Sequence, residues 1–130
     1  CFWNWGAGSG IQSGKTVGLN LGGGWTDGTG MTENGICVDG RLTKIGDDLA
    51  FTYDTGDYMR PWTVRTAASD AIDLTLTPFF QRVAKTDLLV MRSEVNQVFG
   101  HYSGVVVTGA GERIPIDGLV GWVEQHKARW

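Results

Sequence analysis

The sequence predicts an all-β fold, an antiparallel barrel of about eight or nine strands with a helix at its C-terminal end. Apolar residues alternate with polar residues or glycine in short runs, and turn signals separate these runs. No regular strand–helix–strand alternation occurs, as a parallel sheet would require. A chain of 130 residues is long enough for one core, so we expect residues 1–130 to form a single barrel domain.

The N-terminal half begins with strand-like runs. Residues 2–5 read "FWNW", and residues 17–21 alternate apolar side chains with glycine or asparagine, which is the period of a strand. In residues 36–45, Asp39-Gly40 separates two apolar runs, and this dipeptide is the strongest short signal for a hairpin turn.

Further strands are predicted over residues 48–54, 60–66 and 71–79. Residues 87–108 form a longer apolar segment, which is either two strands or one strongly bent strand with the bend at Gly100 or Gly104. Residues 112–116 are the last short strand. Within the long segment, Glu94 and Asn96 share one face of a regular strand, whereas His101 lies on the other.

The C-terminal residues 117–130 have the spacing of an amphipathic helix, with Asp117 as its N-cap. Steps of three and four residues separate the apolar and aromatic positions Leu119, Trp122, Val123, His126 and Trp130. We expect this helix to lie on the barrel. The chain has six tryptophans, and we expect most to be core, with two at most touching a ligand.

The stretch "GAGSGIQSGKT", residues 6–16, superficially resembles a phosphate-binding loop. That pattern requires a glycine at position 9, where this chain has Ser9, and a helix after the loop, where this chain has a strand pattern. We therefore predict a glycine loop between two strands and no nucleotide binding.

Charge and composition exclude several partners. The net charge of −3 and the pI of about 5.2 leave no basic surface for nucleic acid. No apolar stretch approaches the ~20 residues that a transmembrane segment needs. Cys1, Cys37, His101 and His126 lack the short spacing of metal ligands, so we expect no metal site and no cofactor. Two cysteines form no disulfide framework, which fits a cytoplasmic location.

The candidate site combines the glycine-rich loop at residues 22–35 with the segment around residue 101. Both stretches carry glycine, an aromatic ring and hydrogen-bonding groups, a mixture that suits a pocket rim. We expect them to meet at one pocket mouth, with Asp27 as the first polar contact. The predicted ligand-binding residues are Trp25, Asp27, Glu33, Asn34, His101 and Tyr102.

The chain as a whole resembles the family named domain of unknown function 2804. The similarity is carried by the stretches "NWGAGSG", "VGLNLGGGWTDGTGMTENGICVDGRLTKIGDD", "DYMRPW", "RSEVNQVFGHYSG" and "DGLVGWVEQHKARW". Members of this family are longer, and the resemblance implies that this chain is their C-terminal part, with the missing N-terminal part as its partner.

At the level of fold, the family is distantly similar to lipocalin-like double-barrel proteins such as carotenoid hydratases and tocopherol cyclases. This similarity implies a lipocalin-like barrel that holds a small apolar molecule, either a lipid or an isoprenoid. One alternative is an enzyme for acid-catalysed hydration or cyclisation of an isoprenoid double bond, with Asp27, Glu33, Glu94 and His101 as catalytic candidates. Another is a structural half-barrel that only completes a larger protein.

Overall fold

The computed structural model describes residues 2–24, 27–28, 32–88 and 91–129, and this part of the chain is entirely strands, turns and connections, without a helix. The nine strands are β1 (Phe2–Gln12), β2 (Lys15–Gly23), β3 (Gly35–Val38), β4 (Arg41–Lys44), β5 (Leu49–Thr52), β6 (Trp62–Thr66), β7 (Ile72–Leu88), β8 (Met91–Val107) and β9 (Arg113–Arg129). Within the described residues, no helix has the length and apolarity that a membrane span requires.

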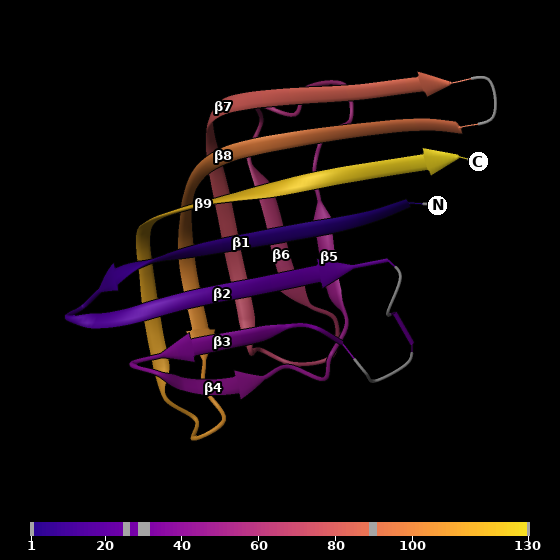
Figure 1. The fold of residues 1–130 in the computed structure, drawn as a ribbon. Helices are drawn as coiled ribbons and strands as arrows, with labels where there is room; N and C mark the ends of the chain where they lie inside the picture. The colour runs from indigo at the N-terminus through magenta and orange to yellow at the C-terminus, as the bar shows by residue number, and fades with distance from the viewer. Residues whose placement is uncertain (1, 25–26, 29–31, 89–90, 130) are drawn as a thin grey trace.

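All strands belong to one antiparallel sheet in the order β4-β3-β2-β1-β9-β8-β7-β6-β5. The sheet curls into a half-barrel, because the long strands β7, β8 and β9 bend sharply and run through two layers (Figure 1). Strands β1 to β4 lie in one layer, and β5 and β6 cross behind them in the other. The all-β, antiparallel prediction is therefore confirmed.

Extra residues mark the bends of the long strands. Phe79 is inserted where the register between β7 and β8 shifts, and Gly118 is inserted where the register between β8 and β9 shifts. Gly118 has a φ of +71°, a conformation that glycine adopts without steric cost. Residues 91–107 are a single bent strand, the second of the two alternatives left open by the sequence.

The predicted C-terminal helix is wrong. Residues 113–129 are strand β9, which pairs with β1 on one side and β8 on the other. Every second residue from Leu119 to Gln125 is buried and the residues between them are more exposed, so the burial follows the period of a strand. Some of the buried positions are also three or four residues apart, which is why the pattern was taken for a helix. The backbone groups of β9 form their hydrogen bonds with β1 and β8, so the segment is a strand.

The core lies between the two layers and is filled by side chains from both. Trp62 and Tyr102 are the largest fully buried side chains. Tyr53 stacks on Trp62 with ring centroids 3.9 Å apart, and the Trp62 indole N–H donates to the Tyr58 carbonyl at 2.9 Å. The inside of the half-barrel is thus a packed core.

Candidate functional site

Two of the predicted site residues stabilise the connection between β2 and β3. The Asp27 carboxylate accepts a hydrogen bond from the Gly24 amide at 3.1 Å. The Asn34 side chain is buried, accepts from the Gly22 amide at 2.6 Å and donates to the Asp47 carbonyl at 3.3 Å. Both side chains therefore hold backbone in place. Trp25, the predicted aromatic contact, lies outside the described residues.

His101 and Tyr102 are neighbours on β8 and point to opposite faces of the sheet. Tyr102 is fully buried, and its hydroxyl donates to the Trp122 carbonyl at 2.6 Å; burial raises its pKa. His101 is exposed, with its ring 5.1 Å from that of Phe79. His101 pairs with Val120 of β9, next to the position that pairs with Gly8 of β1, whereas Asp27 follows the end of β2 that pairs with the start of β1. The structure therefore does not place His101 beside Asp27.

Glu94, the remaining catalytic candidate, is half-buried on β8 opposite Lys127. Its carboxylate accepts a hydrogen bond from the Asn96 amide at 3.0 Å. This bond, assisted by the charges of Lys85 and Lys127, lowers the Glu94 pKa. Glu94 is therefore held in its ionised form.

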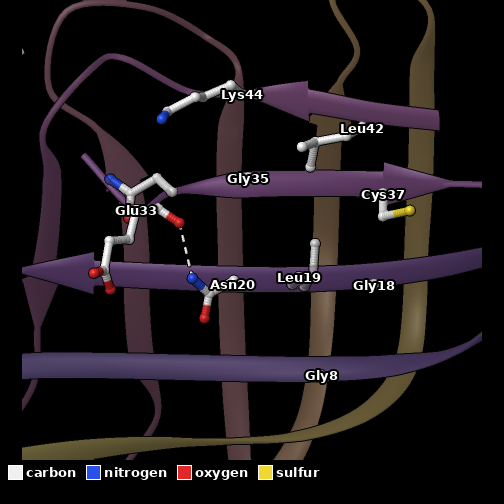
Figure 2. Close-up of a pocket in the computed structure, with 10 residues that line it drawn as sticks. Gly8, Gly18, Leu19, Asn20, Glu33, Gly35, Cys37, Leu42 and Lys44 are labelled. Atoms are coloured by element: carbon white, nitrogen blue, oxygen red, sulfur yellow. Dashed lines mark hydrogen bonds between the residues drawn. The ribbon is translucent and has the colours of Figure 1, made fainter. Parts of the chain in front are cut away.

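Glu33 and Asn34 line a pocket on the outer face of strands β1 to β4, which we call the glycine pocket (Figure 2). Its volume is about 390 Å³. Gly18, Cys37 and Leu42 lie side by side in register, and the small residues leave room beside the exposed Leu42. The complete lining is Gly8, Gly18, Leu19, Asn20, Glu33, Asn34, Gly35, Cys37, Leu42 and Lys44.

The polar and apolar groups of the glycine pocket are segregated. Figure 2 shows Glu33, Asn20 and Lys44 at one end, and Leu42 and Cys37 toward the other. The Asn20 amide donates to the Glu33 carbonyl at 2.8 Å, which fixes the polar end. Such a lining suits a molecule with an apolar body and a polar end.

A second pocket of about 170 Å³ adjoins the polar end, and we call it the tryptophan pocket. Asn20 and Glu33 line both pockets, and the Trp5 indole N–H donates to the Asn20 side-chain oxygen at 2.8 Å. The complete lining is Trp3, Asn4, Trp5, Asn20, Gly22, Glu33 and Glu124. The two pockets are therefore neighbours on β1 and β2, and Asn20 and Glu33 contribute to both.

Glu124 brings a second carboxyl group to the tryptophan pocket. It lies on β9 directly opposite Trp5 of β1. Burial raises its pKa, and a hydrogen bond from the Gln97 amide at 3.1 Å partly offsets this effect. Glu124 was not among the predicted site residues, because its segment was predicted to be a helix.

A strip of aromatic rings continues from the tryptophan pocket across the outer face. The Trp5 and Trp122 rings meet edge to face at 5.5 Å, Trp122 lies 6.3 Å from Phe99, and Phe99 lies 6.1 Å from Phe80. The Trp122 indole nitrogen is buried and has no hydrogen-bond partner among the described residues. Of the described tryptophans only Trp62 is a core residue, contrary to our expectation for most of them.

The inner face carries a row of buried amides that the sequence analysis also did not predict. Asn4, Gln125 and Asn96 are aligned in register across β1, β9 and β8. The Tyr53 hydroxyl accepts from Asn4 at 3.1 Å and from Gln125 at 2.9 Å, and the Tyr58 hydroxyl donates to Gln125 at 2.5 Å. These bonds satisfy polar groups at the end of the core.

The remaining candidates for a site are a third pocket and the possible metal ligands. A pocket of about 550 Å³ lies between the β3–β4 and β8–β9 turns, where Lys15 pairs with Glu112 and the Gly109 amide donates to Thr43. It contains none of the predicted site residues. In the described part of the chain, no three His, Cys, Asp or Glu side chains group as metal ligands would.

Comparison with known proteins gives a family and no closer relative. No curated protein and no solved structure matches this chain. The family model described as "Domain of unknown function (DUF2804)" matches residues 1–130. Because the match spans the whole sequence, the chain belongs to the DUF2804 family.

Proposed function

We propose that this chain binds a small apolar molecule, such as a lipid or an isoprenoid, on the outer face of its half-barrel. The observation that carries the proposal is the pair of adjacent pockets, the glycine and tryptophan pockets, which share Asn20 and Glu33. The volume of about 390 Å³ falls within the ~300–1,000 Å³ that is usual for small-molecule sites.

The packed core favours the outer face over the interior. Trp62 and Tyr102 occupy the space between the layers, where a lipocalin-like barrel would hold its ligand. On the outer face, by contrast, Leu42 is 72% exposed and Trp5 is 37% exposed. We assign Glu33 to contact with the polar end of the ligand, and Asp27 and Asn34 to positioning the loop that carries it.

Binding is tested with 1-decanol as a neutral probe, followed by tryptophan fluorescence and calorimetry on the full-length protein. Gly18→Leu should fill the glycine pocket and weaken binding about tenfold or more. A Cβ at Gly18 would meet only the Cys37 Cβ, at 3.8 Å, so the site tolerates a side chain. Ala50→Leu, an exposed change on β5, is the matched control.

Mass spectrometry of molecules that co-purify with the protein provides an independent test. A retained apolar molecule that is lost in Gly18→Leu and kept in Ala50→Leu supports the proposal. Decanol affinity that is equal in all three proteins, or absent from all three, contradicts it.

A structural half-barrel is the second candidate, because an apolar flank is exposed at the bends of the long strands. Phe79, Phe80 and Val120 are 53%, 55% and 53% exposed, and His101 lies between Phe79 and Val120. If this flank packs against another part of the protein, Phe80→Ser should lower the stability of the full-length protein and leave decanol binding unchanged. Unchanged stability would count against this candidate.

The acid-catalysis alternative receives less support from its candidate residues. It requires a carboxyl group that stays protonated in an apolar pocket. The lowered pKa of Glu94 works against this role, and Glu33 is exposed. Burial raises the pKa of Glu124, which lines the tryptophan pocket but was not among the predicted catalytic residues.

A further inference from the structure

We propose that the tryptophan pocket recognises a cationic ammonium group, so that the ligand has a positively charged head and an apolar tail. This inference rests on the proposed function, because the tail would lie in the adjoining glycine pocket. It concerns one chemical class: alkyl chains that end in a quaternary or protonated amine.

The walls of the tryptophan pocket combine the groups that attract such a cation. Trp3 and Trp5 present indole rings, whose faces are electron-rich and attract ammonium ions. The hydrogen bond to Asn20 fixes the Trp5 ring relative to β2. A volume of about 170 Å³ is below the usual range for whole small-molecule ligands, which fits a head group.

The charge of the pocket is also complementary to a cation. Glu33 and Glu124 are its ionisable lining residues, and neither takes part in an ion pair within the described part of the chain. Burial disfavours the ionised form of Glu124, and a neighbouring cation would compensate for this cost.

The basic groups near the site do not offset these carboxyls inside the tryptophan pocket. Lys44 lines the glycine pocket but not the tryptophan pocket. The His126 ring lies 3.9 Å from the Trp3 ring at a tilt of 49°. Burial lowers the pKa of His126, which favours the neutral ring at neutral pH. The tryptophan pocket therefore has a net negative charge when both glutamates are ionised.

Three probes with the same chain length test the proposal on the full-length protein. They are decyltrimethylammonium, its neutral isostere in which carbon replaces nitrogen, and decanoate. Each is titrated by calorimetry, the two ionic probes below their micelle concentrations and the isostere within its solubility. We expect decyltrimethylammonium to bind with one-to-one stoichiometry and about tenfold more tightly than the isostere, and decanoate to bind most weakly.

Variants of the pocket residues test whether the preference for the cation arises in the tryptophan pocket. Glu33→Gln, Glu124→Gln and Trp5→Leu should each reduce the affinity for the cation and leave that for the isostere nearly unchanged. Glu112→Gln, the same chemical change on the distant β8–β9 turn, should alter neither. Thermal melting checks each variant, and if Glu124→Gln does not fold, the other variants and the unmodified protein still decide.

The outcomes separate this inference from the proposed function. Equal binding of cation and isostere, or tighter binding of decanoate, overturns the ammonium head and leaves apolar binding standing. A cation preference that survives in all three pocket variants overturns its assignment to this pocket. Failure of every probe to bind overturns both proposals.

Discussion

The two faces of strand β1 carry opposite kinds of side chain. Toward the core β1 presents Asn4, Gly6 and Gly8, and toward the outside it presents Trp3 and Trp5. A Cβ at Gly6 would come within 2.6 Å of the Tyr102 hydroxyl, and a Cβ at Gly8 within 3.3 Å of its ring. The core is thus filled by the tyrosine of a different strand, and the large rings of β1 remain available for binding outside.

Removing one tryptophan side chain from the core and one from the outer face should give the largest difference in the free energy of unfolding. Trp62→Ala empties a fully buried and stacked position, so we expect the free energy of unfolding to fall by about 3–5 kcal/mol. Trp5 is 37% exposed, and Trp5→Ala should cost about 1 kcal/mol or less. Urea denaturation measures both, and equal losses would mean that the outer face is as essential to the fold as the core.

Tyr102 and His101 are adjacent on β8, so substituting each of them compares the core face and the outer face within one strand. Tyr102→Phe removes the donor to the buried Trp122 carbonyl, so we expect a loss of about 1–2 kcal/mol. His101→Ala on the exposed side should change stability by less than about 0.5 kcal/mol. If the order of these two effects is reversed in chemical denaturation, the assignment of the faces is wrong.

Glu124 and Glu94 should give opposite dependences of stability on pH. Burial raises the folded-state pKa of Glu124, so its contribution is greatest below the unfolded-state pKa, about 4.3, and is lost as the pH rises through the folded-state pKa. The Asn96 hydrogen bond lowers the pKa of Glu94, so its contribution is present above the unfolded-state pKa and is lost as the pH falls.

Melting temperatures between pH 3 and 7 test this contrast. Relative to the unmodified protein, Glu124→Gln should become more stable as the pH rises, and Glu94→Gln should become less stable. Both side chains are partly exposed, so both effects should be modest. Parallel curves for the two variants would contradict the assigned environments.

Asp27→Asn should have the smallest effect on stability. The Asp27 side chain is exposed, and its acceptor oxygen for the Gly24 amide is retained in asparagine. We expect an almost unchanged melting temperature and nearly unchanged decanol binding, because asparagine keeps the acceptor that holds the loop carrying Glu33. A clear drop in melting temperature with unchanged decanol binding would leave Asp27 with a structural role alone.

Local sequence signals predicted individual strands and turns better than they predicted which strands pair with one another. Asp39-Gly40 was predicted as a hairpin turn, and it connects β3 to β4 with positive φ at both residues. The helix prediction failed because Leu119 and Val123 fit both periods, and only pairing with β1 and β8 decides between them.

The candidate site was predictable only in part, for the same reason. Glu33 and Asn34 belong to a glycine-rich loop, and this local signal led to the glycine pocket. The tryptophan pocket requires Trp5 to lie opposite Glu124, and residues from distant parts of a sequence carry no local mark of such a pairing. His101 and Tyr102 were grouped together although adjacent strand residues point to opposite faces.

The pairing of β1 with β9 has a consequence for the order in which the protein can be made. These two strands lie at the centre of the sheet and join a meander of β1 to β4 to a meander of β5 to β9. During synthesis the edge of β1 that pairs with β9 therefore stays unpaired until β9 has emerged from the ribosome. Until then the nascent chain has an unpaired strand edge beside Trp3 and Trp5, and such an edge can pair with other chains.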